Sequence, residues 1–245
     1  LGPDVKESNL KITVNHDGNI RFGLGAVKGV GEAAVQSIME ERKKNGPFLG
    51  IFDFVQRVNL NACNKKDMEC LALAVGFDSF PELKREQYFA ANSKGELFLE
   101  TLMRYGNRYQ ADKAAAVNSL FGGENVIDVA TPEIPPGLER WSDLDRLNRE
   151  RDLVGIYLSA HPLDEFSIVL EHVCNTRMSE LEDKAALAGR EITMGGIVTS
   201  VRRGVSKNGN PYGIAKIEDY SGSTEIPFWG NDWVTYQGYL NEGTF

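Results

Sequence analysis

Residues 22–32 read FGLGAVKGVGE, a stretch that places Gly29 and Gly31 around one small apolar residue. The apolar residues that follow have the spacing of one helix face: Ala34, Val35, Ile38 and Met39. Glu32 suits the positive end of this predicted helix, and Asn45-Gly46-Pro47 ends it. The stretch therefore predicts a tight glycine turn that leads into a helix at Glu32.

The start of a helix presents unpaired backbone N–H groups and a partial positive charge, and glycines let a phosphate approach closely. We therefore interpret the turn as a helix-hairpin-helix that binds the DNA backbone through Lys28, Gly29, Val30 and Gly31. A plain tight turn between packed helices is the alternative. A dinucleotide-binding loop is disfavoured, because no third glycine completes the G-x-G-x-x-G spacing.

A second hairpin is predicted downstream. Residues 52–58 form a short helix, Asn64 is the N-cap of the next helix, and Gly76 ends that helix. Lys65 and Lys66 lie in its first turn, where positive charge opposes the helix dipole and an anionic partner would offset that cost. DNA binding by these three polar residues and an ordinary solvated face remain equal alternatives.

Composition and length describe a soluble protein. The 245 residues suggest about two domains, no apolar run approaches a membrane span, and no signal peptide is visible. We therefore expect a cytoplasmic protein without a membrane partner. The spacing of Cys63, Cys70 and Cys174 matches no zinc or redox motif, so neither a metal site nor a catalytic residue is predicted.

The net charge of −8 is unevenly distributed. Residues 20–75 carry eight Lys or Arg against six Asp or Glu, and residues 190–245 carry five against six. Residues 124–187 carry six against fourteen, so the middle of the chain holds the acidity. The two flanking regions are close to neutral, which permits contacts to phosphate.

The rest of the first three-quarters of the chain is mainly helical. Periodicity predicts helices over residues 83–120, 143–158 and 178–187, with a Pro-rich linker over residues 124–138. Residues 1–21 contain an alternating strand pattern followed by Asp17-Gly18-Asn19, a turn. We expect these first residues to be the end of an upstream domain.

The last part of the chain changes to β-structure. Strands are predicted over residues 192–201, 212–217 and 223–229, with a basic loop over residues 202–210 and glycines that bend the first strand. Short strands joined by glycine-rich turns suggest a small β-barrel. Cations beside aromatic rings are typical of single-strand binders, and the candidates are Arg202, Arg203, Lys207, Tyr212 and Trp229. The alternative is that these rings are core residues.

Three groups of motifs, in order, carry a resemblance to a known family. They are residues 20–32 with Gly46-Pro47-Phe48, residues 64–66 with Gly76-Phe77-Asp78-Ser79, and residues 150–163 followed by residues 196–222. This order resembles the tandem helix-hairpin-helix and OB-fold region of the alpha subunit of bacterial DNA polymerase III. Pro227 departs from the apolar run of the family's third strand, and we expect an edge position or a distortion there.

The resemblance implies a replicative DNA polymerase whose palm domain lies upstream and holds Mg²⁺ through aspartates. The carboxylates of this chain lie on predicted helices or loops, so we expect no cofactor here and no activity from this piece alone. Its implied partners are duplex DNA, the single-stranded template, the sliding clamp and other replisome subunits. The second hairpin lacks the Gly-x-Gly of the first.

The family also has a short clamp-binding peptide between these modules. In this chain it corresponds to Val117, Asn118, Ser119, Leu120 and Phe121. The resemblance implies that Leu120 and Phe121 are the anchors, while Val117 replaces the usual glutamine. A helix end that packs its last two apolar residues is the alternative.

The predicted fold is multidomain α + β. Its parts are the upstream end at 1–21, a duplex-binding tandem helix-hairpin-helix domain at 22–120, a clamp-peptide linker and helical connector at 121–189, and a truncated OB-fold barrel at 190–245. A non-enzymatic DNA-binding accessory or repair protein is the alternative function. A NAD-dependent DNA ligase is disfavoured, because its OB-fold precedes the hairpins and a four-cysteine zinc site lies between.

Overall fold

The computed structural model describes residues 1–118, 129–137 and 140–245. The chain forms two compact units, Leu1–Ser159 and Ala160–Phe245. The boundary between them falls within the connector expected over residues 121–189. Residues 1–21 belong to the first unit and contribute Val5 to its core. Among the described residues, no helix is both long enough and apolar enough to cross a membrane.

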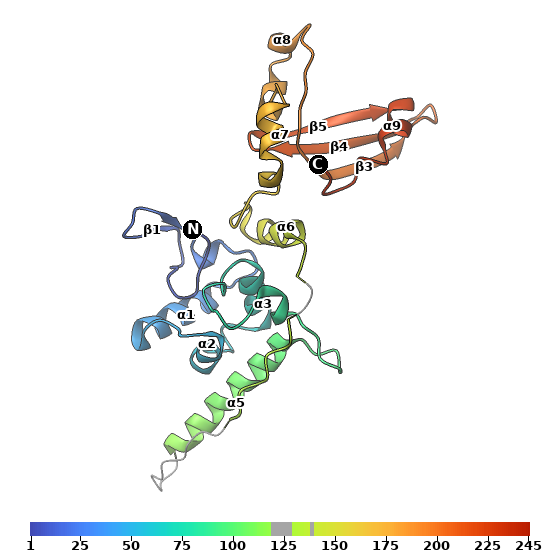
Figure 1. Ribbon diagram of the computed structural model, residues 1–245. Helices are drawn as coiled ribbons and strands as arrows, with labels where there is room; N and C mark the ends of the chain where they lie inside the picture. Colours follow the sequence, from blue (N-terminus) through green and yellow to red (C-terminus); the bar gives the residue numbers. More distant parts are fainter. Residues whose placement is uncertain (119–128, 138–139) are drawn as a thin grey trace. The chain divides into compact units, whose positions relative to one another are not determined.

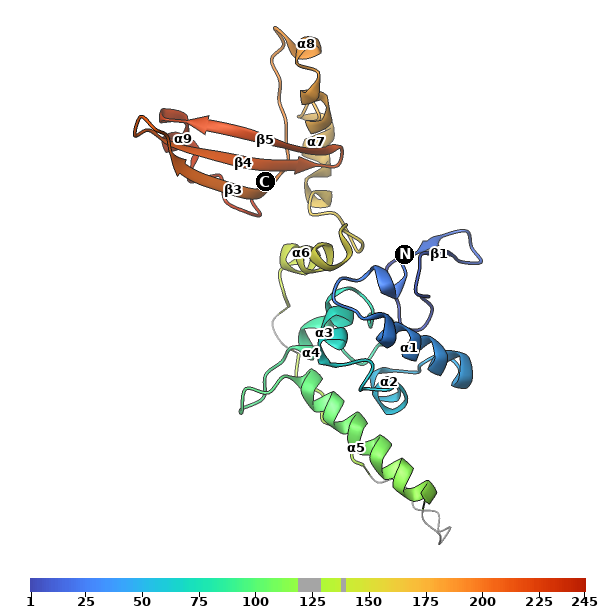
Figure 2. The same ribbon diagram turned by 180° about the vertical axis from the view of Figure 1, so that it is seen from behind.

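The first unit consists of a small β-ribbon and helices (Figure 1). Its elements are β1 (Thr13–Val14), β2 (Ile20–Arg21), the 3-10 turn η1 (Leu24–Ala26), α1 (Glu32–Asn45), α2 (Ile51–Arg57), α3 (Lys65–Leu73), α4 (Arg85–Tyr88), α5 (Phe98–Asn118) and α6 (Asp143–Val154). The predicted starts of α1 at Glu32 and of α3 directly after Asn64 are confirmed. Both views show the C-terminal part of α5 extending beyond α1, α2 and α3 (Figures 1 and 2).

The prediction of one continuous helix over residues 83–120 is wrong. The chain leaves the helix after α4 and makes a turn in which the Asn92 side chain accepts hydrogen bonds from the backbone of Lys94 and Glu96. Gly95 in this turn has a φ of +79°. Because an asparagine side chain can replace helical hydrogen bonds by local ones, the segment before α5 is not helical.

Two other helix ends differ from the prediction. The helix predicted over residues 143–158 ends at Val154, because Gly155 adopts a left-handed φ of +92° and closes it. Helix α3 ends at Leu73, and the left-handed residue after it is Val75, with a φ of +73°, rather than Gly76. A β-branched residue rarely adopts this conformation. A backbone hydrogen bond from Gly76 to Leu71 closes the helix end.

The core of the first unit is rich in aromatic rings. Phe54 lies between Phe48 and Phe77, with ring centroids 4.9 and 5.2 Å apart, and all three side chains are buried. Helix α5 packs on α2 at Gly106, where an added Cβ would lie 2.4 Å from the carbonyl oxygen of Val55. This close approach requires a residue without a side chain. The core thereby fixes the positions of α2 and α5 relative to each other.

The second unit combines short helices with an antiparallel sheet. Its elements are η2 (Asp164–Phe166), α7 (Ser167–His172), η3 (Met178–Glu182), α8 (Lys184–Leu187), β3 (Ile197–Val205), β4 (Pro211–Asp219), β5 (Gly222–Trp229) and α9 (Asn231–Tyr236). The strand order is β3-β4-β5, and Figures 1 and 2 show the three strands side by side. The single acidic helix predicted over residues 178–187 is a 3-10 turn followed by a short helix, with Asp183 capping the second.

The predicted strand boundaries need two corrections. Strand β3 begins at Ile197 rather than residue 192, so Gly195 and Gly196 precede the strand instead of bending it. Arg202 and Arg203 lie within β3, and the turn is confined to residues 206–210. The expected edge position of Pro227 is confirmed, because β5 is the outer strand of the sheet, where a missing N–H does not interrupt pairing.

The described residues of the second unit form an open three-stranded sheet and not a closed barrel. One face is covered by Trp233 of α9, which packs so closely on Gly213 that an added Cβ would lie 2.1 Å from its ring. Residues 243–244 form backbone hydrogen bonds with Val198 at the start of β3. The opposite face of the sheet carries exposed side chains, among them Trp229.

Candidate nucleic-acid interface

The first hairpin turn is held between α3 and α6. Val27 is buried against Cys70 and Ala74, while Lys28 and Gly29 are exposed. Gly29 has a φ of +87°, and an added Cβ would lie 2.7 Å from the Cys70 sulfur. Both conditions restrict this position to glycine. The predicted turn is thus a closely fitted loop whose outer surface faces solvent.

Several N–H groups of this loop are already used within the protein. The N–H of Lys28 donates to the carbonyl oxygen of Leu153 at 2.9 Å, and that of Val30 donates to Val27 at 3.2 Å. The N–H of Gly31 donates to Asp67 Oδ1 at 2.8 Å. The expectation that a phosphate approaches the backbone through Gly31 therefore needs correction, because the Asp67 carboxylate holds that group.

The start of α1 is different. Gly31 is its N-cap and has no side chain that could cap the first turn. Within the described residues, the N–H groups of Glu32, Ala33 and Ala34 have no hydrogen-bond partner. Such groups, together with the helix dipole, favour an anion. Because Ala34 is fully buried, the donors open to solvent are those of Glu32 and Ala33, which begin one residue beyond the predicted set.

The start of α3 is closed by its own side chains. Asn64 Oδ1 accepts from the backbone N–H of Lys66 at 2.8 Å, and Asp67 Oδ2 accepts from the N–H of Asn64 at 2.9 Å. This reciprocal capping box confirms Asn64 as the N-cap. Two donors that an anion could use at α3 are therefore occupied within the helix.

The two lysines of α3 have different surroundings. Lys65 forms ion pairs with Glu100 at 2.5 Å and with Glu69 at 3.7 Å, and the hydrogen bond that it donates to Glu100 raises the pKa of Lys65. Lys66 is exposed, and it forms no ion pair with any described residue. Its Cε lies 3.6 Å from the position of a Cβ on Gly29. Lys66 thus lies against the first hairpin.

Asp67 is a residue that the sequence analysis missed. It is only 3% exposed, and its two oxygens accept hydrogen bonds from Gly31 and Asn64, one in each hairpin. An Asp three residues after an Asn N-cap indicates a capping box, so the sequence contained evidence for half of this role. The bond to Gly31 spans 36 residues and has no local pattern.

A buried ion pair joins α6 to α4 within the first unit. Glu150 is fully buried, and its oxygens accept from Arg85 at 3.1 Å, from the N–H groups of Leu158 and Ser159 at 2.6 Å, and from the Ser159 hydroxyl at 2.6 Å. Burial alone would lower the pKa of Arg85, but hydrogen bonds to Asp78 and Glu150 raise it. Since α6 also provides the carbonyl that holds Lys28, this pair supports the hairpin.

The candidate single-strand residues lie on both faces of the sheet. Tyr212 and Trp229 are paired neighbours on the face opposite Trp233, with ring centroids 4.9 Å apart, and Trp229 is 55% exposed. Arg202 is paired with Ile214 and so shares their face, where it forms an ion pair with Glu225 at 2.6 Å. The structure thus brings together three of the five candidates.

The other two candidates lie elsewhere. Arg203 alternates to the covered face, where its guanidinium lies 5.8 Å from the centre of the Trp233 ring and contacts Asn241. Lys207 lies in the exposed turn between β3 and β4. Successive side chains of a strand point to opposite faces, so the consecutive Arg202 and Arg203 are separated. The sequence prediction placed both in a loop, where this alternation does not apply.

The proposed clamp-binding residues are only partly within the described chain. Val117 and Asn118 form the end of α5. Ser119, Leu120 and Phe121 lie outside the described residues.

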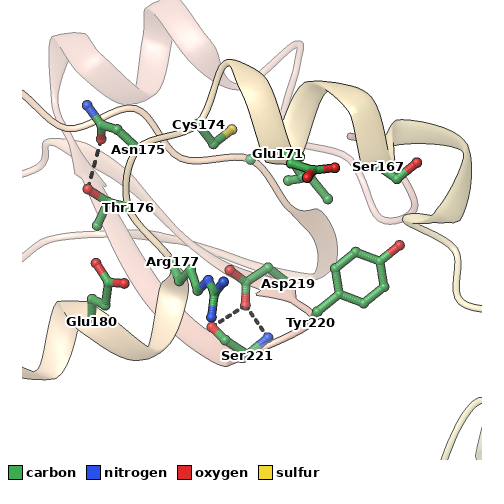
Figure 3. Close-up of a pocket in the computed structure, with 12 residues that line it drawn as sticks. Ser167, Glu171, Cys174, Asn175, Thr176, Arg177, Glu180, Asp219, Tyr220 and Ser221 are labelled. Carbon is green, nitrogen blue, oxygen red and sulfur yellow. Dashed lines mark hydrogen bonds between the residues drawn. The ribbon is translucent and has the colours of Figure 1, made fainter.

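A cavity of about 650 Å³ lies in the second unit between α7, η3 and the turn after β4 (Figure 3). In Figure 3 the side chains of Asp219 and Ser221 point toward one another, and the Asp219 carboxylate also accepts from the N–H groups of Met178 and Gly222. Burial opposes ionisation of Asp219, but these hydrogen bonds lower its pKa. Asp219 therefore joins η3 to the sheet, which is a structural role.

Over the described ranges, no three His, Cys, Asp or Glu side chains are grouped so that they could hold a metal ion. His172 is the last residue of α7, and Cys174, two residues further on, lines the cavity of Figure 3. The described carboxylates thus do not fit the two-metal site of a polymerase palm.

Comparison with known proteins supports the assignment of a helix-hairpin-helix motif to the first part of the chain. Residues 1–88 match the helix-hairpin-helix motif family. The chain is 31% identical over 242 residues to the DNA polymerase III subunit alpha of Pasteurella multocida, covering 99% of this chain and 20% of that protein. The corresponding protein of Mycobacterium tuberculosis is 33% identical over 244 residues, covering 96% of this chain and 19% of that protein.

A third relative, the DNA polymerase III subunit alpha of Chlamydia muridarum, is 31% identical over 245 residues, covering 99% of this chain and 19% of that protein. The chain thus spans about a fifth of the length of the relatives that it matches. Nearly the whole of this chain is homologous to a part of the alpha subunit of bacterial DNA polymerase III, and its first 88 residues carry a helix-hairpin-helix motif.

Proposed function

We propose that this chain binds DNA for a bacterial replicative DNA polymerase, and that its first hairpin contacts the duplex backbone. The observation that carries the proposal is the open start of α1, where the exposed Glu32 and Ala33 have N–H groups without a partner among the described residues, beside the exposed Lys28. Contacts of this kind recognise phosphate and not base sequence.

The chemistry of synthesis is assigned to another part of the longer protein. The relatives are named as polymerase subunits and are about five times as long as this chain. The described carboxylates do not form a metal-holding group, so we propose that the Mg²⁺-binding palm lies outside this chain and that this chain alone does not synthesise DNA. We further propose a cytoplasmic location, where replication takes place.

The second unit is proposed to bind the single-stranded template as part of an OB-fold. Its support is the exposed sheet face that combines Tyr212, Trp229 and Arg202, with Lys207 in the adjoining turn. Aromatic faces stack on bases of any sequence, while cations attract the backbone. Because Arg202 is paired with Glu225, its positive charge attracts single-stranded DNA only when a phosphate displaces the Glu225 carboxylate.

The peptide over residues 117–121 is proposed to bind the sliding clamp, as the resemblance implies, in a polymerase that also contacts other replisome subunits. Replacing Leu120 and Phe121 by Ala and measuring clamp binding tests this role. We expect binding to be lost, and unchanged affinity would exclude the peptide.

Duplex binding is tested by Gly31→Glu. Gly31 has an ordinary φ of −75°, and the nearest atom to an added Cβ is Asp67 Oδ1 at 3.6 Å, so a side chain fits there. Gly31→Gln is the matched control, since it has the same size without the charge. We expect Gly31→Glu to bind duplex DNA about tenfold more weakly than Gly31→Gln, because the carboxylate occupies the place of a phosphate.

The measurement is the affinity for duplex and single-stranded oligonucleotides over a series of salt concentrations. Gly31→Glu should also reduce the salt dependence of duplex binding by about one phosphate contact, with single-strand binding unchanged. Equal duplex affinities of the Glu and Gln variants would show that the start of α1 does not contact DNA.

A further inference from the structure

We infer that the two hairpins of the first unit form one phosphate-binding site, to which Lys66 of the second hairpin contributes its charge. This inference rests on the proposed duplex binding by the first hairpin, and it assigns α3 a different task from α1. The tandem arrangement by itself suggests two separate sites, one at each helix start.

The first step is that α3 offers fewer open donors than α1, because Lys65 supplies its one first-turn N–H group without a partner among the described residues. Asn64 caps the N–H groups of Lys66 and Asp67, at 2.8 and 3.4 Å. Lys65 is paired with Glu100 and Glu69, so its ammonium is neutralised by two carboxylates. A phosphate that used the other first-turn donors of α3 would have to displace the Asn64 side chain that caps them.

The second step concerns where Lys66 lies. Its Cε is 3.6 Å from the position of a Cβ on Gly29, and Cys70, one helical turn further along α3, fills the space directly behind that glycine. Burial raises the pKa of the Cys70 thiol, and the nearby Lys66 charge acts in the opposite direction. Lys66 thus places its positive charge at the turn that precedes α1.

The third step is that Asp67 fixes this arrangement. Asp67 is only 3% exposed, and its carboxylate accepts hydrogen bonds from the N–H groups of Gly31 in the first hairpin and of Asn64 in the second. A charged acceptor with two N–H donors makes strong hydrogen bonds. Because Lys66 is adjacent to Asp67, the bond that orients the first turn also places Lys66 beside it.

The resulting site has two cations and one open helix start. Lys28 and Lys66 are exposed and form no ion pair with described residues, and the uncapped N–H groups of α1 begin at Glu32. Two acidic groups border it, the exposed Glu32 and the buried Asp67. This balance suits one backbone phosphate held by two cations and the helix start, while α3 serves as the support.

A double-mutant cycle in the whole chain distinguishes one shared phosphate-binding site from two separate sites at the starts of α1 and α3. Lys66→Ala is measured for duplex binding over a salt series, once alone and once in the Gly31→Glu background. For a single site, Lys66→Ala weakens binding about threefold to tenfold alone and reduces the salt slope by about one. In the Gly31→Glu background it should change the affinity by less than twofold, because the shared phosphate is already lost.

Lys65→Ala is the matched control, since Lys65 is adjacent on the same helix turn but is paired with acidic side chains. We expect its effect on duplex affinity to stay below twofold. All the variants change exposed positions, and thermal unfolding verifies that they are folded.

Two outcomes would overturn the inference while leaving the proposed function in place. The first is an equal effect of Lys66→Ala in both backgrounds, which indicates a separate second site. The second is a loss for Lys65→Ala as large as that for Lys66→Ala, which indicates that α3 binds DNA through its own helix start. Unchanged binding by Gly31→Glu alone would instead remove the proposed duplex function and this inference with it.

Discussion

The starts of α1 and α3 follow similar hairpins but end in opposite states. At α1 the N-cap is Gly31, and the first-turn N–H groups meet no partner among the described residues. At α3 the N-cap is Asn64, and Asp67 completes a capping box. A cap stabilises a helix by satisfying the donors that a ligand would otherwise use. One helix start is thus stabilised by its own caps, whereas backbone donors of the other have no partner among the described residues.

The largest expected effect comes from removing the support of the open start. Glu150→Ala leaves the buried Arg85 without one of its two carboxylates and the N–H groups of Leu158 and Ser159 without an acceptor. We expect the free energy of unfolding to fall by about 3–5 kcal/mol, as for other broken buried ion pairs. Chemical denaturation measures it.

The control is Asp152→Ala on the same helix, where the side chain is 73% exposed. Its effect should stay within about 0.5 kcal/mol. A loss below about 1 kcal/mol for Glu150→Ala would mean that the ion pair does not support α6.

The next effect sharpens the division between duplex and single-strand binding. Trp229→Ala removes the most exposed ring of the sheet face, and stacking on one base contributes about 1–3 kcal/mol. We therefore expect single-strand affinity to fall about tenfold, with duplex affinity unchanged. Fluorescence anisotropy with a labelled oligonucleotide measures both.

Tyr239→Ala is the control for Trp229→Ala, because Tyr239 is 77% exposed but follows α9 instead of lying on the sheet. Equal losses for the two variants would contradict a specific role of the sheet face. Retention of affinity by Trp229→Phe would support stacking, since the ring is preserved.

A smaller effect tests the closed helix start. Asn64→Ala removes the acceptor for two N–H groups of α3, and loss of an N-cap costs about 1 kcal/mol. Asn64→Ser should retain most of the stability, because a serine hydroxyl can also cap. If thermal and chemical denaturation show no difference between the Ala and Ser variants, capping does not stabilise α3.

The smallest effect is a gain in stability at the other end of α3. Val75 has a φ of +73°, a conformation that asparagine tolerates better than a β-branched residue. Val75→Asn should raise the free energy of unfolding by about 0.5–1 kcal/mol, less any loss of contact with Gly2. Val75→Thr keeps the branched shape and should show no gain, so equal stability of the two variants would argue against strain.

Much of the helical framework follows from local pattern. The start of α1 at Glu32 and the cap at Asn64 were predictable because apolar spacing and capping residues act over a few positions. The break before α5 was not predicted, since the hydrogen bonds of Asn92 compete with helix only once the turn forms. The strand location of Arg202 and Arg203 was missed because their basic character resembled that of a loop.

The candidate site shows the same limit. The glycine turn and Lys28 could be identified from spacing, and the resemblance to the polymerase subunits agreed with the matches found over the whole chain. The hydrogen bond from Gly31 to Asp67 and the contact of Lys66 with the first turn could not be identified, because 36 or more residues separate the partners. Such pairs depend on how α3 packs against the first turn.

The sequence by itself determined that this chain has a glycine hairpin, a capped second helix and a β-rich end, because turns, caps and strand patterns are local properties. Only the tertiary structure decided which N–H groups stay open. Asp67 is brought to Gly31, and Leu153 to Lys28, by packing of α3 and α6 against the turn. A helix start becomes a binding site when no neighbouring side chain satisfies it, and that depends on the whole unit.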